Sequence, residues 1–170
     1  MDEQSLLQLI QRHARRHAPR WLELGIGDDC AIIRPAGSGE DWLLTTDMVL
    51  EDRHFRLATH PAQAVGYRTL ARGLSDIAAM GGEPRLALLS MCAGAGTGAR
   101  WLDRFFRGFH RLAAEANTVL VGGDMARAEK FGCDIVVAGV VPPGKALRRD
   151  GARPGDRIYV SGRLGGSALG

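Results

Sequence analysis

The segment from Arg100 to Ala116 carries large apolar side chains on one side of a helix and arginines on the other. A helix with so wide an apolar face must be covered by a second layer of the fold. Segments rich in β-branched residues follow it in the chain, and these fit a pleated, half-buried surface. The helix is therefore predicted to pack on a β-sheet. Its apolar residues are Trp101, Leu102, Phe105, Phe106, Phe109, Leu112 and Ala113.

Helical and strand-like patterns alternate along the rest of the chain. Two more helices are predicted, over 2–17 and over 61–80, where Pro61 suits a first turn and Gly81 ends the run. This pattern predicts an α+β fold, a two-layer sandwich of a mixed β-sheet with helices on one face. The predicted strands span 30–33, 42–46, 86–92, 118–121 and 133–141, and the first two form a hairpin.

The composition limits the function classes. The chain has 170 residues and a formal net charge of +3, with basic residues spread along it, so a nucleic-acid partner is not expected. It has neither an apolar run close to the length of about 20 residues that a membrane span needs nor the pattern of a secretory signal. A cytoplasmic protein without a membrane partner is expected. Its three cysteines are widely spaced, which favours buried side chains over a disulfide or zinc site.

The segment 142–154 is rich in Pro, Gly and Arg and is typical of a linker. A new strand is predicted after it, over 156–161. We therefore expect one domain over 1–150 and the start of a second, truncated domain over 151–170.

Two adjacent carboxylates, Asp28 and Asp29, follow Gly25-Ile-Gly directly before a predicted strand. Glycines let the backbone bend tightly there, and two carboxylates on one loop repel each other unless a cation holds them. An ordinary turn, in which aspartates bind the local backbone, is the alternative.

Further acidic and hydroxyl groups occur at three other places. Thr45, Thr46 and Asp47 end a predicted strand, where they offer metal ligands or a cap. Asp76 falls among the apolar positions of its helix, so a cation or a buried arginine should meet it. Gly123 and Asp124 are predicted to follow a strand directly, in a turn or a binding site.

Together these places supply five carboxylates, more than one structural ion pair needs. Clustering them in space requires several divalent cations, and several Mg²⁺ ions together usually accompany polyphosphate. The chain lacks a phosphate-binding loop of the Walker A type, because Gly144-Lys145 is followed by alanine. Arg148 and Arg149 are candidates for phosphate recognition or solvated surface residues, and His54 is a candidate for substrate contact or a structural role.

At this point the motifs resemble the thiamine-monophosphate kinases of the aminoimidazole ribonucleotide synthetase superfamily. The resemblance follows the chain in order and covers nearly all of it. It is carried by Gly25-Ile-Gly-Asp-Asp-Cys-Ala31, Thr45-Thr-Asp-Met48, Glu51-Asp-Arg-His-Phe55, Leu74-Ser-Asp-Ile-Ala-Ala-Met-Gly81, Gly122-Gly-Asp124 and Pro154-Gly-Asp-Arg-Ile-Tyr-Val-Ser-Gly162. Gly73 departs from the asparagine common at its place in the family.

The resemblance implies ATP-dependent phosphorylation of thiamine monophosphate to thiamine diphosphate, by direct transfer assisted by several Mg²⁺ ions. It also implies the superfamily's N-terminal fold, dimerisation through this domain and a second domain with further site residues. The alternatives are a non-catalytic fragment that dimerises and binds Mg-nucleotide, and a related ATP-using synthetase. The implied Mg²⁺ ligands are Asp28, Asp29, Thr45, Thr46, Asp47, Asp76 and Asp124; Gly123, Asp124, Arg149 and Phe106 would contact ATP, and His54 would contact thiamine monophosphate.

Overall fold

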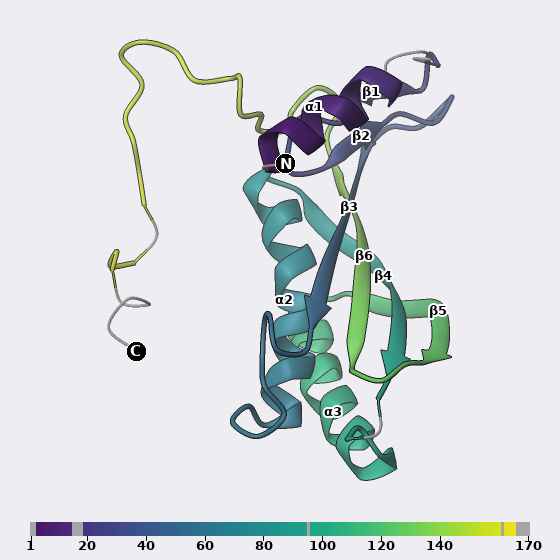
Figure 1. Cartoon of the computed structure of the whole chain (residues 1–170). Helices are drawn as coiled ribbons and strands as arrows, with labels where there is room; N and C mark the ends of the chain where they lie inside the picture. The colour runs from purple at the N-terminus through teal and green to yellow at the C-terminus, as the bar shows by residue number, and fades with distance from the viewer. Residues whose placement is uncertain (1–2, 15–18, 95, 161, 166–170) are drawn as a thin grey trace.

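The protein is described by a computed structural model, which covers residues 3–14, 19–94, 96–160 and 162–165. Figure 1 shows α2 and α3 side by side against one face of a sheet, with α1 near the end where β1 and β2 lie. The helices are α1 (Glu3–Ala14), α2 (Ala62–Ala79) and α3 (Ala99–Glu115). The strands are β1 (Leu22–Leu24), β2 (Ala31–Ile33), β3 (Asp41–Leu50), β4 (Glu83–Ala93), β5 (Val119–Arg127) and β6 (Gly132–Val141).

The six strands form one mixed sheet in the order β1-β2-β3-β6-β4-β5. Only the β4–β5 pair is parallel among the strand pairs of the described residues, and the others are antiparallel. With helices on one face, this arrangement confirms the predicted α+β two-layer fold. The order also separates neighbours in sequence: β6 is inserted between β3 and β4, so β5 lies at the sheet edge farthest from the β1–β2–β3 side.

The core lies between the sheet and the two long helices. Phe105 and Phe109 of α3 are fully buried, as are Leu70 and Ile77 of α2. Phe105 packs against Phe131, which lies just before β6, with ring centroids 5.6 Å apart. The apolar face of 100–116 is thus buried as predicted, and its arginines stay on the surface.

Helix α2 ends at a glycine because the chain must turn sharply there into β4. Gly81 has φ of +71°, a left-handed conformation that glycine adopts without strain. The N–H groups of Gly81 and Gly82 donate to the carbonyl oxygens of Ala78 and Ile77 at 3.0 and 2.9 Å. These two bonds form a Schellman motif, which satisfies carbonyls left free at the helix end.

The predicted bounds of α2 and α3 agree with the structure to within about two residues, and the β2–β3 hairpin is confirmed. Three predictions were wrong. Thr45, Thr46 and Asp47 do not end a strand; β3 continues past them to Leu50, where its pairing with β6 ends. Gly122, Gly123 and Asp124 do not follow a strand; they lie inside β5, whose backbone pairs with β4. Residues 156–160 form no strand, and residue 161 lies outside the described residues. Strand β1 was not predicted.

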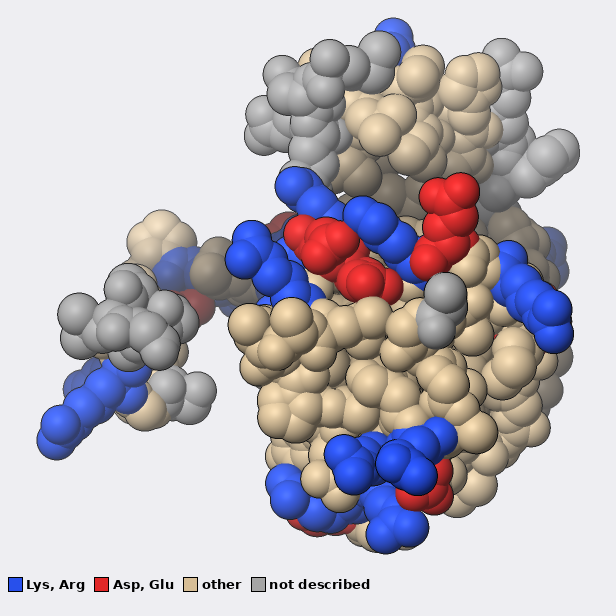
Figure 2. Space-filling model, turned by 60° about the horizontal axis from the view of Figure 1, so that its bottom comes forward, with Lys and Arg blue, Asp and Glu red and all other residues tan. Residues whose placement is uncertain are grey.

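The sheet face opposite the helices leaves apolar side chains exposed, among them Met48, Leu88 and Val121. Figure 2 shows Lys and Arg side chains in separate groups, with uncharged surface between them. Among the described helices, none has the length and apolarity required to cross a membrane.

Candidate functional site

The loop before β2 holds Asp28 and Asp29 against the segment that follows β6. Asp28 Oδ1 accepts a hydrogen bond from the backbone N–H of Asp29 at 2.9 Å, and Asp28 Oδ2 accepts one from the backbone N–H of Arg149 at 3.1 Å. Asp28 therefore makes the local backbone contact of an ordinary turn. Both carboxylates also form ion pairs with the Arg149 guanidinium, Asp28 at 3.6 Å from Nε and Asp29 with Nη2.

The periods of a strand and a helix bring four side chains together between β3 and α2. Thr45 and Asp47 are two residues apart on β3 and so share one face of the sheet. Arg72 and Asp76 are four residues apart on α2 and so share one face of the helix. Thr45 Oγ1 donates to Asp76 Oδ2 at 2.6 Å, and Arg72 Nη2 donates to Asp47 Oδ1.

Thr46 points to the opposite face of the sheet, as strand alternation requires. Its hydroxyl donates to Asp134 of β6, with distances of 2.7 and 2.8 Å to the two carboxylate oxygens. Its side chain is therefore separated from Thr45 and Asp47, and only its backbone lies beside them.

Burial, together with the neighbouring carboxylates of Asp47 and Asp29, raises the pKa of Asp76. The hydrogen bond from Thr45 and the charge of Arg72 act in the opposite direction. A cation bound among these carboxylates would relieve their mutual repulsion. The sequence left open a buried arginine as the partner of Asp76. The arginine beside it is Arg72, but Arg72 is only partly buried and its ion pair is with Asp47.

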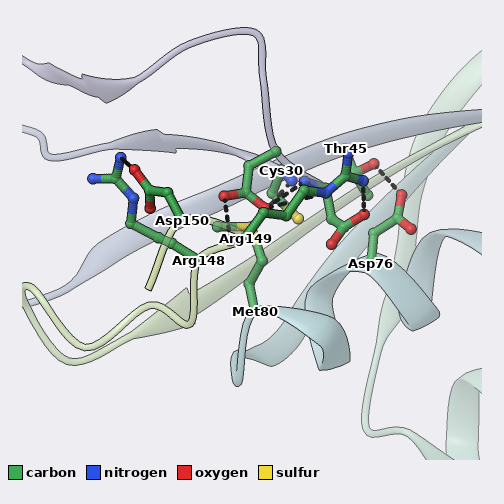
Figure 3. Close-up of polar contacts among 9 residues, drawn as sticks. Cys30, Thr45, Asp76, Met80, Arg148, Arg149 and Asp150 are labelled. Atoms are coloured by element: carbon green, nitrogen blue, oxygen red, sulfur yellow. Dashed lines mark hydrogen bonds and ion pairs between the residues drawn. The ribbon is translucent and has the colours of Figure 1, made fainter. Parts of the chain in front are cut away.

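Arg149 crosses from the segment after β6 to this group. Figure 3 shows it extending toward Thr45 and Asp76, whereas Arg148 points away from them and pairs with Asp150 at 3.0 Å. Hydrogen bonding and attraction to Asp29 raise the pKa of Arg149. Of the two candidate arginines, only Arg149 contacts Asp28 and Asp29 among the described residues.

The donor set suits Mg²⁺, which prefers carboxylate and other oxygen ligands. Among the described residues, however, no three Asp, Glu, His or Cys side chains already form a metal-binding group. The physical reason is that Arg72 and Arg149 supply the positive charge beside Asp47 and Asp29. A metal ion would have to displace these guanidinium groups from their partners.

A second group of predicted site residues lies near the β5 edge of the sheet. Phe106 of α3 and Gly123 and Asp124 of β5 line one cavity of about 310 Å³, together with Leu89 and Met91 of β4. A Cβ atom on Gly123 would lie 1.9 Å from the carbonyl oxygen of Leu89, so glycine is needed for this close strand approach. The predicted ATP-contacting residues Phe106, Gly123 and Asp124 therefore share one cavity, but Arg149 does not line it.

The strand register gives the separation of the two groups. Asp47 pairs with Ile135, Ile135 with Leu89, and Leu89 with Gly123, so two strands lie between Asp47 and Gly123. With neighbouring strands about 4.8 Å apart, the two Cα atoms are about 14 Å from each other. Mg²⁺ holds its ligands at about 2 Å, so one ion cannot join Asp47 and Asp124 of the same chain.

His54 lies in the loop after β3, apart from the ion pairs described above. Its Nδ1 accepts a hydrogen bond from the backbone N–H of Leu50 at 2.9 Å, and its carbonyl oxygen accepts one from Arg68 at 2.9 Å.

Cys30, next to Asp29 in the chain, is buried. Its burial is the main cause that raises the pKa of its thiol to about 12, and the nearby carboxylates raise it further. Cys30 therefore remains protonated near neutral pH and is a structural residue.

Sequence reasoning missed Arg72 because a single arginine on an amphipathic helix is usually a solvated residue. Its position four residues before Asp76 was the available signal, since it places the two side chains on one helix face. Knowing its partner also required the pairing of α2 with β3, which sequence reasoning did not establish.

Three comparisons relate the chain to known proteins. The family model of AIR synthase related protein, N-terminal domain, matches residues 27–141. The thiamine-monophosphate kinase of Bacillus subtilis is 34% identical over 171 residues, covering 100% of this chain and 52% of that protein. The thiamine-monophosphate kinase of Escherichia coli K12 is 38% identical over 149 residues, covering 88% and 45%.

A solved structure, AaThiL complexed with AMPPCP and TMP, matches with a TM-score of 0.78 and 30% identity, covering 89% of this chain and 45% of that one. The chain thus spans about half the length of the relatives it matches. Hydrogenase maturation protein HypE in complex with ATP shares the fold, with a TM-score of 0.59 and 23% identity. The resemblance found in the sequence motifs is confirmed.

Proposed function

The chain belongs to the family of AIR synthase related proteins, and from this premise we propose that it acts in the ATP-dependent phosphorylation of thiamine monophosphate to thiamine diphosphate. The observation that carries the proposal is the convergence of Asp29, Thr45, Asp47 and Asp76 at one place. The named relatives and the AMPPCP- and TMP-bound AaThiL structure support the same substrates.

In this reaction a phosphate oxygen of thiamine monophosphate forms a new bond to the γ-phosphorus of ATP, and the bond from that phosphorus to the oxygen retained by ADP breaks. We propose that Asp29, Asp47 and Asp76 hold Mg²⁺, with Asp28, the Thr45 hydroxyl and the Thr46 backbone beside them. When bound there, Mg²⁺ would supply positive charge that offsets the negative charge developing on the phosphate oxygens during transfer.

The remaining residues are proposed to position the two substrates. Arg149 carries a planar guanidinium that can bind two phosphate oxygens at once, so it orients the ATP phosphates after leaving Asp29. His54 contacts the phosphate of thiamine monophosphate. Phe106, Gly123 and Asp124 bind along the nucleotide, with the aromatic ring as an apolar contact and Asp124 as a further Mg²⁺ ligand.

The separation of about 14 Å between the two groups requires a second copy if both act on one nucleotide. We propose a homodimer in which Asp124 of one copy approaches Asp76 of the other, so that each site contains residues of both subunits. The chain exposes apolar side chains that a partner could cover, among them Met48, Leu88 and Val121. A dimer would also cover apolar surface that is otherwise in contact with water.

Mixing two inactive variants tests this arrangement. In a mixed dimer of Asp76→Ala and Asp124→Ala subunits, a shared site leaves one of the two sites intact, and Mg-ATP binding should return to about half the wild-type stoichiometry in the mixed species. If each site belongs to one chain, every site stays damaged and no binding returns. Sedimentation of the wild-type chain tests the dimer independently, and a monomer at all concentrations would refute it.

Calorimetric titration of ATP with Mg²⁺ into the chain, beside a turnover assay with thiamine monophosphate, tests the function. The kinase proposal requires binding that Asp76→Ala abolishes. Turnover would show catalysis by these 170 residues, and binding without turnover would favour the non-catalytic Mg-nucleotide-binding fragment. Turnover of another acceptor in preference to thiamine monophosphate would favour a related ATP-using synthetase. Retained binding in Asp76→Ala would overturn the metal assignment.

We also propose that residues 1–150 form the nucleotide-binding and dimerisation domain and that a second unit begins within 151–170. Residues 151–160 support this boundary because they are exposed and contain no helix or strand. A cytoplasmic location, where ATP is available, is proposed with the function.

A further inference from the structure

We propose that Arg72 is an anion-binding residue of this site, and that its guanidinium passes from Asp47 to a phosphate oxygen when a metal–polyphosphate complex binds. The inference rests on the proposed function, because it concerns the same carboxylates and the same class of ligand. It adds a residue that neither the motifs nor the named relatives assign to the site.

The position of Arg72 makes this exchange possible. It lies on α2 one turn before Asp76, and its Nη2 donates to Asp47 Oδ1 on β3. Neither side chain is sealed from solvent, with Arg72 31% and Asp47 23% exposed. A ligand that reaches Asp47 therefore also reaches the guanidinium group.

One nitrogen of Arg72 lacks a partner. Its Nε is buried and makes no hydrogen bond, and it is the only such buried side-chain nitrogen or oxygen among the described residues. A buried donor without an acceptor is unfavourable and is rare in folded proteins. The guanidinium has five N–H donors in a fixed fork that matches phosphate oxygens, so a phosphate bound after a small rotation of the side chain would satisfy the free donor.

The charges favour the same exchange. A metal ion on Asp47 must compete with Arg72, and it would then repel the released guanidinium at short range. A metal ion that carries phosphate avoids this conflict, because the negative oxygens attract both the ion and Arg72. Arg72 should therefore weaken the binding of bare Mg²⁺ and strengthen the binding of Mg²⁺ with polyphosphate.

A purely structural role makes a different prediction. If Arg72 only holds α2 against β3, its removal would disturb Asp47 and Asp76 together and would weaken metal and nucleotide binding in parallel. The two roles therefore differ in the direction of one effect, the change in affinity for Mg²⁺ alone.

The experiment is calorimetric titration of the 170-residue chain with Mg²⁺ alone, with ATP and Mg²⁺, and with tripolyphosphate and Mg²⁺. Arg72→Gln keeps much of the side chain without its charge, and Arg72→Lys keeps the charge without the fork. Arg107→Ala is the matched control, since Arg107 is an exposed helical arginine that pairs only locally with Asp103 at 3.0 Å.

For Arg72→Gln we expect about tenfold weaker binding of both Mg-polyphosphate ligands, because about one charge-assisted hydrogen bond is lost. Binding of Mg²⁺ alone should be unchanged or tighter. Arg72→Lys should fall between Arg72→Gln and the wild type, and Arg107→Ala should match the wild type. Thermal unfolding checks that each variant is folded. If Arg72→Gln does not fold, Arg72→Lys provides the test, with a smaller loss of Mg-polyphosphate affinity expected.

The inference would be overturned, while the proposed function stands, by wild-type Mg-ATP affinity in Arg72→Gln or by parallel losses of affinity for Mg²⁺ and Mg-ATP. Absence of Mg-ATP binding in the wild-type chain would overturn both the inference and the proposed function. Loss with ATP but not with tripolyphosphate would show that Arg72 acts on the nucleoside, which also contradicts the inference.

Discussion

Replacing Gly66 by alanine tests how closely α2 and α3 must approach. A Cβ atom at Gly66 would lie 1.9 Å from the carbonyl oxygen of Phe105, where an ordinary contact begins at 3.4 Å. The helices must therefore separate locally by about 1.5 Å to admit one methyl group. The obstacle is backbone, which cannot rotate aside as a flexible side chain can.

The cost can be worked from this geometry. Overpacking a well-packed core typically costs about 1–3 kcal/mol, and a backbone obstacle places Gly66→Ala near the upper value. Alanine is favoured over glycine inside a helix by about 1 kcal/mol, which offsets part of the cost. The net loss should be about 2 kcal/mol, equivalent to a fall in melting temperature of about 4–8 °C for a domain of this size.

Urea and thermal unfolding of Gly66→Ala measure this loss directly. Gly39→Ala is the control, because a Cβ atom there would meet no atom within 4 Å, and its effect should stay within about 0.5 kcal/mol. Gly108 makes the reciprocal contact, with its Cβ 1.9 Å from the carbonyl oxygen of Gln63. The double variant should lose less than the two single losses together, since one separation of the helices serves both. Wild-type stability in Gly66→Ala would refute the reasoning.

Three further predictions concern the site and its support. Burial raises the pKa of Asp76 above 3.8, so the folded protein loses stability as pH rises from that value to the raised pKa. In urea unfolding at pH 7 without Mg²⁺, Asp76→Asn should therefore be more stable than the wild type, and equal stability would contradict this. The hydrogen bond from Arg34 lowers the pKa of Asp41, so this carboxylate stabilises the fold above pH 3.8, and the contribution is lost as pH falls through the lowered pKa. Asp41→Asn should therefore reduce the loss of unfolding free energy at acid pH, and an unchanged acid dependence would exclude that contribution. A methyl group on Gly123 would force β5 from Leu89, so Gly123→Ala should lower both the melting temperature and Mg-ATP affinity in calorimetry, and unchanged values would show that the edge strand tolerates the displacement.

Local sequence patterns predicted the elements that carry the site. The apolar period of α3 and the Pro61 and Gly81 signals of α2 were sufficient, because helix formation and termination depend on residues close in sequence. The facing of Thr45 and Asp47 likewise follows from the two-residue period of a strand.

Glycine was the source of the main error in the strands. Gly122 and Gly123 were predicted to follow a strand, in a turn or a binding site, since glycine usually weakens or ends a strand. In the structure Gly123 instead permits the backbone of β5 to approach the Leu89 carbonyl. The sequence pattern cannot distinguish these two uses, because the neighbour that requires the glycine is distant in the chain.

The strand order accounts for what the motifs could not show about the site. Their order along the chain favoured one cluster of carboxylates. Both β6 and β4 lie between β3 and β5, however, so Gly123, the neighbour of Asp124, is about 14 Å from Asp47. The group at Asp47 and Asp76 already carries two guanidinium groups, whereas Asp124 lies beside an aromatic ring and a glycine backbone. One group thus has the charges suited to metal and phosphate, and the other has the flat apolar surface suited to a base. A Mg-nucleotide needs both kinds of surface, so chemistry as well as distance favours the proposed site shared between two copies.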